Sequence, residues 1–519
     1  MLNVKNTIKT VGFMVVATLL AKIAGMGREV LFANLYGTGS EAAAFLTASR
    51  IPLLFFDITL GAAISSTFIP VFNEYLENGK QEDASRYANT FINAILLITG
   101  FFCTLGILFA GPIAGFIGSG LGESEKTLAA QLVIILFPTM LFTGIAYALT
   151  GILQSYGEFN VPAAISLVSN LLMMLYLIIA KDHFGIHGVA FAMLISWGFQ
   201  VIIQLPALHK KRFRYRPVLD LKSDGMKKTV ALALPILISS WVQPINSTVN
   251  IYLASFLNDG QAVPALDYAN KLYIIFVGVL TYAISNLIFP SISRLAAGNH
   301  KEELADVVGK AVKIVIALIL PVMIIFLALR VPIVRFVYER GEFNAQSTAL
   351  TSTALLFYSL GMVGFGVSEI MNKAFYALKD GKTPMYVAMG GISLNILLSF
   401  VMVRGFNTGL WGVALAASIA ANVIGLILLI RLNKKLHCFK LKDLFNSLKL
   451  IFSAAIMLIC VNISSAQIIF SDSLGGRFLA VLLPAALGII VYVILLFVTR
   501  TDESKELITI LFRNRKKVD

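Results

Sequence analysis

Long apolar stretches recur from one end of this 519-residue chain to the other, and they limit its fold more than any other feature. Many exceed 18 residues, about the length that an α-helix needs to cross the hydrocarbon core of a bilayer. In lipid, only helices and closed barrels satisfy all their backbone groups. The sequence therefore predicts an all-α, polytopic membrane protein with about 14 transmembrane helices. A composition of 58% hydrophobic and 13% charged residues excludes an ordinary soluble domain.

Basic residues gather in a few loops, and this asymmetry predicts the orientation of the chain. Lys and Arg crowd residues 209–228, and further basic clusters follow residues 430 and 499. By the positive-inside rule, these segments and both termini lie in the cytoplasm. The net charge of +14 is explained in the same way, so it does not predict a nucleic-acid partner.

The sequence also repeats itself at a nearly constant interval. Residues 63–70 resemble 283–290, residues 151–162 resemble 374–384, and residues 188–190 recur at 412–414. Such offsets predict two six-helix lobes in a parallel repeat, with a cavity between them. The predicted divisions are an N-terminal lobe at 1–208, a basic cytoplasmic linker at 209–228, a C-terminal lobe at 229–435, and two extra helices with a cytoplasmic tail at 436–519.

The first apolar stretch, near residues 11–35, carries Lys22, Arg28 and Glu29 at membrane depth. Each would cost roughly 2.5–3.5 kcal/mol if it faced lipid, so we expect the three to line a polar cavity. Lys22 and Glu29 share a helix face, with Arg28 about 100° away. Gly25 and Gly27 leave room for a bend or a close neighbouring helix. In the alternative interpretation, the three side chains snorkel or pair with one another.

Three further charged residues lie in predicted spans. Arg50 and Asp57 fall in the second span, near residues 42–72, which we expect to be interrupted at residues 50–52; Lys271 falls in the eighth. Arg50 and Lys271 nearly correspond in the repeat, so each lobe would present a cation from its second helix. With Lys22 and Arg28, these cations suit an anion such as pyrophosphate. The alternative is that Arg50 and Lys271 snorkel at an interface.

Other polar residues at membrane depth favour structural roles. Glu369 and Lys373 are expected to form an i,i+4 pair. Interhelical hydrogen bonds are expected from four amides: Asn246, Asn250, Asn395 and Asn422. A sodium site that includes Asn250 and Asn395 is a second interpretation. No catalytic, phosphate-loop or metal-ligand motif occurs, so we expect no enzyme activity and no other cofactor.

Four motifs resemble those of a known family. They are KIAGMGRE at 22–29, FIPVFNEY at 68–75, YERGEF at 338–343 and ALKDGKTP at 377–384. Together they resemble the MurJ/MviN lipid II flippases, within a superfamily of polysaccharide and drug exporters. The resemblance implies alternating access of two lobes, which moves lipid II, an undecaprenyl-pyrophosphate-linked peptidoglycan precursor, from the inner to the outer leaflet of the bacterial cytoplasmic membrane.

The resemblance also implies roles for individual residues. Lys22, Arg28, Glu29 and Lys271 match positions that matter for activity in the family, and the last two helices would form a groove for the lipid tail. Relatives often carry arginine at the places of Phe56 and Asp57, and aspartate at the place of Ala43. The expectation is that Arg50 supplies the missing cation. Membrane lipids and cell-wall synthesis enzymes are further expected partners, and the membrane potential is the expected driving force.

Four other functions remain open from the residues alone. The nearest is a flippase for another polyprenyl-linked oligosaccharide, which would differ only in its sugar preference. A drug antiporter would need an acidic or neutral cavity, in contrast to the cationic one expected here. A membrane scaffold for cell-wall enzymes would tolerate loss of Arg28. An enzyme acting on polyprenyl phosphates would need a catalytic constellation, and the sequence contains no such motif.

Overall fold

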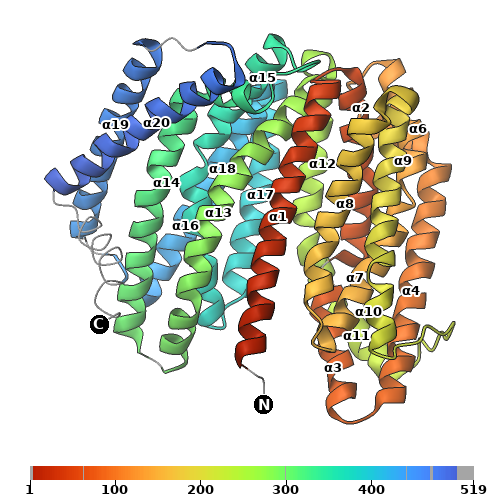
Figure 1. Ribbon diagram of the computed structural model, residues 1–519. Coiled ribbons are helices and arrows are strands. Elements are labelled where there is room, and N and C mark those ends of the chain that lie inside the picture. Colours follow the sequence, from red (N-terminus) through yellow and green to blue (C-terminus); the bar gives the residue numbers. More distant parts are fainter. Residues whose placement is uncertain (1–3, 62–63, 299, 440, 468–470, 500–519) are drawn as a thin grey trace. The chain divides into compact units, whose positions relative to one another are not determined.

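The computed structural model describes residues 4–61, 64–298, 300–439, 441–467 and 471–499 (Figure 1). These residues form helices joined by short connections and contain no β-strand, which confirms the all-α prediction. Within them, eleven helices are long and apolar enough to cross a membrane, or twelve if one bent pair counts as a single span. The predicted number of about 14 spans is therefore not reached by this criterion. The predicted tail after residue 499 lies outside the described residues.

Close contacts divide the chain into two compact units, Met1–Pro264 and Ala265–Asp519. In the first unit the helices are α1 (Val4–Tyr36), α2 (Ser40–Phe56), α3 (Ile69–Glu77), α4 (Gln81–Leu108), α5 (Ala110–Ile117), α6 (Glu123–Leu136), α7 (Thr139–Ser155), α8 (Asn160–Ile179), α9 (Lys181–Ile202), α10 (Leu205–Lys210), α11 (Asp224–Ser240) and α12 (Val242–Ser255). The unit thus includes α11 and α12, which the internal repeat assigns to the C-terminal lobe. The lobe boundaries drawn from the repeat stay a prediction.

The cytoplasm-proximal half of the first unit, on the predicted orientation, is held by an aromatic core. Phe68 stacks on Phe72, Tyr87 and Phe91, with ring centroids 4.5–5.5 Å apart. Tyr87 also shares a 2.5 Å hydrogen bond with Thr229, which fastens α11 to α4. The motif at 68–75 is therefore explained by packing: it supplies three aromatic rings, Phe68, Phe72 and Tyr75, to the core shared with α4.

The second predicted span is broken, but not where Pro52 suggests. Helix α2 continues through Pro52 to Phe56, and the chain then widens into π-helical segments at Asp57–Gly61 and Ile64–Phe68. The predicted break at residues 50–52 is therefore wrong in position. A proline removes one backbone donor without always ending a helix. The hydroxyl of Thr59 donates to the carbonyl of Phe55 at 2.7 Å, where the helix changes pitch.

The second unit contains α13 (Ala262–Ala297, which begins just before the boundary), α14 (Lys301–Val337), α15 (Ala345–Ser359), α16 (Met362–Ala377), α17 (Lys382–Phe400), α18 (Leu410–Leu436), α19 (Leu441–Gln467) and α20 (Leu474–Val498). Helices α15 and α16 form the bent pair, with an angle of 46° between them. Helices α19 and α20 pack on each other and on α14. Residues 283–290 lie within the continuous α13, whereas the first copy of this motif spans a break, so the two copies fold differently.

Candidate functional site

Two glycines on α1 allow α8 to approach closely beside the charged residues. A Cβ atom on Gly25 would lie 3.4 Å from the Asn170 amide nitrogen, and one on Gly27 would lie 3.2 Å from the Met174 methyl. The Asn170 amide donates to the Ala21 carbonyl at 3.2 Å. The glycines therefore serve the close helix contact that the sequence suggested, and α1 continues as one helix from Val4 to Tyr36.

Arg28 and Glu29 form an ion pair on α1, in which the Arg28 guanidinium contacts the Glu29 carboxylate. The Glu29 side chain is 10% exposed and the Arg28 side chain 33% exposed, so the pair places the carboxylate inside and leaves part of the guanidinium accessible. Lys22 lies about 9 Å further along the helix axis. Its side chain is exposed, and the described part of the chain provides no ion pair for it.

Arg50 lies at a depth similar to that of Arg28. The rings of Phe32 on α1 and Phe45 on α2 are 5.1 Å apart, and the two helices run in opposite directions across a short connection. Arg28 precedes Phe32 by four residues and Arg50 follows Phe45 by five, so both lie about 6–8 Å from this aromatic contact. Asp57 follows about 10 Å later and feels the charge of Arg50. The first unit thus carries charged side chains at two depths. Arg28 and Arg50 lie near the Phe32–Phe45 contact, and Lys22 and Asp57 lie about 9–10 Å from them along the helices.

The π-helical segment after Phe56 leaves a backbone carbonyl available next to Asp57. The Trp241 indole, between α11 and α12, donates to the carbonyl of Ile58 at 2.6 Å. An irregular turn of this kind within a membrane-spanning segment requires such a substitute partner. Trp241 was not singled out from the sequence, because only the fold brings it to the break.

Two departures from the family pattern have a structural explanation. Phe56 is 2% exposed and packs 5.8 Å from the ring of Tyr147, so an arginine there would enter a packed core. Ala43 is fully buried, and a Cβ atom on Gly260 would lie 3.7 Å from its methyl group. Neither place can accept a charged side chain without local rearrangement. Asp57, in contrast, is half-buried and remains beside the other charged residues.

In the second unit, Lys271 pairs with Asp267 one helical turn earlier on α13, with the ammonium nitrogen 2.5 Å from a carboxylate oxygen. Asp267 was missed in the sequence, although its i,i+4 spacing to Lys271 was a visible signal. Tyr268 follows it and is fully buried against Tyr338 and Phe343, at ring distances of 5.1 and 5.7 Å. The motif at 338–343 therefore anchors the start of α13, which carries the pair.

Residues 335–340, at the end of α14, take part in an ion-pair network. Arg477 at the start of α20 donates to the Glu339 carbonyl at 2.6 Å and contacts Asp472 at 2.9 Å. Arg335 contacts Glu339 and Asp472, both at 3.1 Å. We name these four residues the α14–α20 clasp. It fixes Asp472 and the start of α20 to the end of α14.

Lys373 and Asn422, two other polar residues predicted to have structural roles, each make a contact with a neighbouring helix. Lys373 lies 5.3 Å from the centroid of the Phe289 ring, and the described residues show no ion pair between it and Glu369 within 4 Å. The expected pair is therefore replaced by a cation–π contact. Asn422 binds the Gly364 amide and the Leu360 carbonyl, which joins α18 to α16 as expected.

The two amides suggested for sodium, Asn250 and Asn395, lie in different units. Asn250 lies in the first unit, and its buried carbonyl oxygen has no hydrogen-bond partner among the described residues. Asn395 lies in the second unit, where its carbonyl oxygen accepts from Ser399 at 3.4 Å. No cluster of three acidic, His or Cys ligands occurs in the described ranges.

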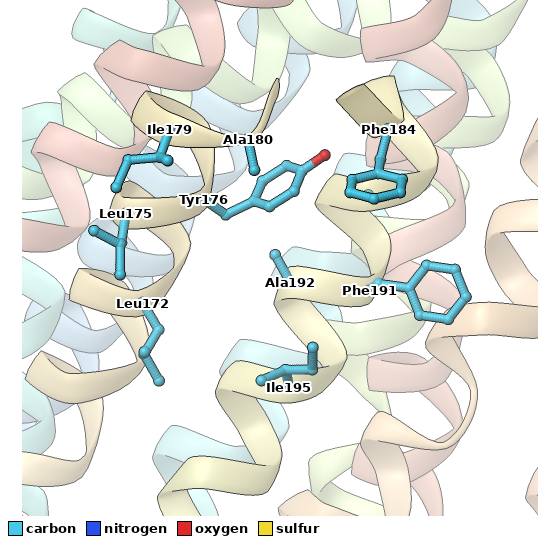
Figure 2. Close-up of a pocket in the computed structure, with 10 residues that line it drawn as sticks. Leu172, Leu175, Tyr176, Ile179, Ala180, Phe184, Phe191, Ala192 and Ile195 are labelled. Atoms are coloured by element: carbon cyan, nitrogen blue, oxygen red, sulfur yellow. The ribbon is translucent and has the colours of Figure 1, made fainter. Parts of the chain in front are cut away.

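A pocket of about 620 Å³ lies between α8 and α9 (Figure 2). Apolar side chains from both helices face it, among them Leu175, Phe191 and Ile195. The Tyr176 ring points into it, while its hydroxyl donates to the Gly185 carbonyl at 3.1 Å. The described side chains that line this pocket carry no charge, so it suits hydrocarbon and not a pyrophosphate group.

Comparison of the sequence with known proteins identifies relatives over most of the chain. The model of the family described as lipid II flippase MurJ matches residues 32–485. A probable lipid II flippase MurJ from Buchnera aphidicola subsp. Schizaphis graminum is 27% identical over 461 residues, covering 88% of each chain. The lipid II flippase MurJ of Burkholderia cenocepacia is 26% identical over 427 residues, covering 80% of this chain and 82% of the relative.

Solved structures give the same result for the fold. A lipid II flippase MurJ in an inward closed conformation matches with a TM-score of 0.79 and 25% identity, covering 97% of this chain and 99% of that one. An inward-facing multidrug resistance MATE transporter of the MOP superfamily matches with a TM-score of 0.69 and 16% identity over 82% of this chain and 98% of that one, which concerns the fold alone. The chain therefore belongs to the MurJ family of lipid II flippases.

Proposed function

We propose that this protein is a lipid II flippase of the bacterial cytoplasmic membrane, which carries the undecaprenyl-pyrophosphate-linked precursor between leaflets by alternating access. Family membership over most of the chain supports this function. The observation that carries the proposed mechanism is the Arg28–Glu29 ion pair on a helix at membrane depth. A helix that served only as an anchor would not hold such a pair, because each charge is costly there.

In this mechanism, the carboxylates hold the cations until the substrate arrives. Arg28 pairs with Glu29 in the first unit, and Lys271 pairs with Asp267 in the second. A pyrophosphate group carries more charge than one carboxylate and offers several acceptor oxygens, so it displaces the carboxylate from the cation. Arg28 would grip the pyrophosphate with two donors, and Lys271 would contribute a single charge. Glu29 and Asp267 then recapture the cations after release.

Lys22, Arg50 and Asp57 complete the proposed site. Lys22 is exposed on the helix that carries Arg28, and Arg50 lies at a depth similar to that of Arg28 on α2. We assign both cations to the pyrophosphate and its first sugar. Asp57 interacts with Arg50 as a second carboxylate, comparable to Glu29.

The membrane potential is the proposed driving force, with both termini in the cytoplasm. A potential of 100 mV is worth about 2.3 kcal/mol for each elementary charge that crosses it. An empty cationic site would be drawn towards the negative cytoplasmic side, and a site neutralised by pyrophosphate would be released to the outer side. Unchanged flipping after dissipation of the potential by a protonophore would exclude this driving force. Cell-wall synthesis enzymes, which consume lipid II, are proposed as partners.

The test is the exposure of lipid II on the outer leaflet in bacteria whose own flippase is depleted. The parent chain should restore exposure and growth, whereas Arg28→Ala at equal expression should fail. Arg28→Lys should restore exposure in part, because it keeps the charge but loses the two-donor geometry. Arg294→Ala, which removes an exposed cation on α13, is the matched control and should behave as the parent.

The outcomes separate the proposal into its two parts. If the parent fails to expose lipid II but exposes another polyprenyl-linked glycan, the substrate is wrong. If Arg28→Ala restores exposure as well as the parent does, the protein remains a flippase but Arg28 does not bind the pyrophosphate.

A further inference from the structure

The basic segment between α10 and α11 is held against the side of α4 by a row of hydrogen bonds. Asn89 on α4 donates to the Arg214 carbonyl at 3.2 Å and accepts from the Arg216 amide at 3.0 Å. Asn93, one turn later, donates to the carbonyls of Arg216 and Val218 at 3.3 and 2.8 Å. Bonds at every second residue are typical of an extended chain. Residues 213–220 therefore follow α4 in a fixed register.

Two further contacts close this attachment. The Tyr215 hydroxyl donates to the Asn93 carbonyl oxygen at 2.6 Å, and the Asp220 amide donates to the Thr90 hydroxyl at 3.3 Å. Arg86 forms an ion pair with Asp220 at 3.1 Å. The bonds use the backbone of Arg214 and Arg216, so their guanidinium groups remain available.

Six exposed cations at residues 210–222 have no acidic partner within the described part of the chain. The acidic groups nearby are occupied, since Asp220 pairs with Arg86, and Asp224, the first residue of α11, pairs with Lys227. One of the six, Lys211, donates to the Tyr156 carbonyl. We name the other five the linker array: Lys210, Arg212, Arg214, Arg216 and Lys222. The array is thus a surface of uncompensated positive charge.

The position of the array along α4 places it at the edge of the bilayer. Asn89 and Asn93 lie about 12 and 18 Å from the start of this helix. One turn after Asn93, Leu97 is 58% exposed, and Phe101 follows at 60% exposed, so the apolar outer face of α4 begins directly above the array. Such a position corresponds to the head-group region of one leaflet.

Exposed apolar side chains alternate with the cations. Tyr215, Leu219 and Leu221 are each about half exposed. Phe213, at the start of the segment, is partly buried and packs against the core of the first unit. Tyrosine is enriched at membrane–water interfaces, and leucine would enter the boundary of the acyl chains. Figure 1 shows this segment as the yellow-green loop that leaves the helices near α10 and α11.

We propose that the linker array is a binding site for anionic phospholipid head groups in the leaflet that adjoins the basic linker. The phosphates would contact Arg212, Arg214 and Arg216, while Tyr215, Leu219 and Leu221 enter the interface. Charge complementarity selects an anionic lipid, and the fixed attachment to α4 keeps the cations at head-group height. This site uses none of the residues assigned to the pyrophosphate, and it requires no transport activity.

The test uses the purified full-length protein in detergent micelles, with phosphatidylglycerol and phosphatidylcholine as probes. Native mass spectrometry counts retained lipids, and a labelled phosphatidylglycerol gives the affinity. The parent should retain phosphatidylglycerol in preference to phosphatidylcholine. Each cation near an anionic surface is worth roughly a fivefold change in binding, so Arg212→Gln/Arg214→Gln/Arg216→Gln should weaken phosphatidylglycerol binding by about 100-fold.

A matched control separates this site from the net charge of the protein. Arg294→Gln/Lys301→Gln/Lys382→Gln removes three exposed cations from the second unit and should leave binding within a few-fold of the parent. An equal loss in both triple variants would overturn the proposal, as would equal retention of the two lipids by the parent. In the latter case, an acidic soluble partner becomes the better occupant.

A second variant tests the attachment to α4. Asn89→Ala/Asn93→Ala keeps all five cations but removes the bonds that hold residues 214–218. It should lower phosphatidylglycerol binding by about tenfold or more, with a melting temperature close to that of the parent. Unchanged binding would show that the held geometry is not needed, and would overturn the proposal that this segment forms a built site. Displacement by glycerol phosphate at equal concentration would also contradict it, because the lipid tails should contribute.

Discussion

The ammonium group of Lys271 lies 2.5 Å from the carboxylate of Asp267, so the second unit repeats on α13 the cation–carboxylate pairing that Arg28 and Glu29 make on α1. The Asp267 side chain is 12% exposed and that of Lys271 is 25% exposed. In both units the carboxylate is the more buried partner, and the cation has the greater access to a ligand. Because the cation is the more exposed partner in both pairs, each unit is suited to capture an anion.

Removing Lys271 should cost more stability than removing both members of its pair. Lys271→Ala leaves a nearly buried carboxylate without its cation, which costs about 3 kcal/mol in comparable buried pairs. The double variant Lys271→Ala/Asp267→Asn should recover most of this loss, but it should not recover flipping. Thermal unfolding in detergent gives the stability, and lipid II exposure gives the activity. Recovery of flipping in the double variant would show that Lys271 serves only to neutralise Asp267.

Loss of the Glu29 carboxylate should strengthen substrate binding and slow release. Glu29→Gln keeps the size of the side chain but removes the charge that competes with pyrophosphate for Arg28. We expect undecaprenyl pyrophosphate to bind the purified variant about 10-fold to 150-fold more tightly, since a hydrogen bond to a charged group is worth about 1.5–3 kcal/mol. Turnover should fall at the same time. Weaker binding than that of the parent would mean that Glu29 orients Arg28 and does not compete for it.

Much of this fold could be predicted from the sequence because the membrane imposes simple rules. The apolar stretches predicted the helices, and Gly25 and Gly27 predicted a close neighbour, since both depend on local composition. The charged residues of α1 were found because a charge at membrane depth is conspicuous. The family followed from short motifs, such as that at 338–343, whose aromatic rings form a buried cluster.

The remaining features depend on contacts between distant residues. In the break after Phe56, the Ile58 carbonyl accepts a hydrogen bond from the Trp241 indole. The sequence near Phe56 gives no sign of this bond, because Trp241 lies far along the chain. The attachment of residues 213–220 to α4 depends on Asn89 and Asn93, more than 120 positions earlier. Asp267 is the exception, because its i,i+4 spacing to Lys271 is visible in the sequence itself.

The turn before α17 should make a contribution to stability that is lost in acid. Asp380 contacts the Lys435 ammonium and accepts a hydrogen bond from the Thr383 amide at 3.0 Å, and these two contacts, in that order, lower the pKa of its carboxyl to about 2. Its pKa in the unfolded chain is about 3.9. The stabilisation is therefore complete above pH 4 and is lost as the pH falls from about 4 to 2.

Lys435→Met tests this assignment. At pH 7 it should lower the free energy of unfolding by about 0.5 kcal/mol, because Lys435 is half exposed. Between pH 4 and 3, the variant should lose less stability than the parent, since its Asp380 would titrate nearer to the ordinary pKa. The control is Lys434→Met, which removes the neighbouring exposed lysine. Parallel pH profiles for Lys435→Met and the parent would contradict the assignment.

The α14–α20 clasp should determine how firmly the last two helices are held to the second unit. Arg477 is 19% exposed and connects three groups: the Glu339 carbonyl, the Glu339 carboxylate and Asp472. Arg477→Ala should increase hydrogen exchange at the start of α20 about tenfold, because bonds from a charged donor contribute about 1.5–3 kcal/mol and part of this is replaced by water. Arg340→Ala is the matched control, since its guanidinium donates to the Phe336 carbonyl on the preceding turn. If both variants exchange at the rate of the parent, the packing of α19 and α20 on α14 holds these helices, and the clasp contributes little. If only Arg477→Ala exchanges faster, the clasp sets the mobility of α19 and α20, the two helices that the family resemblance assigns to the lipid tail.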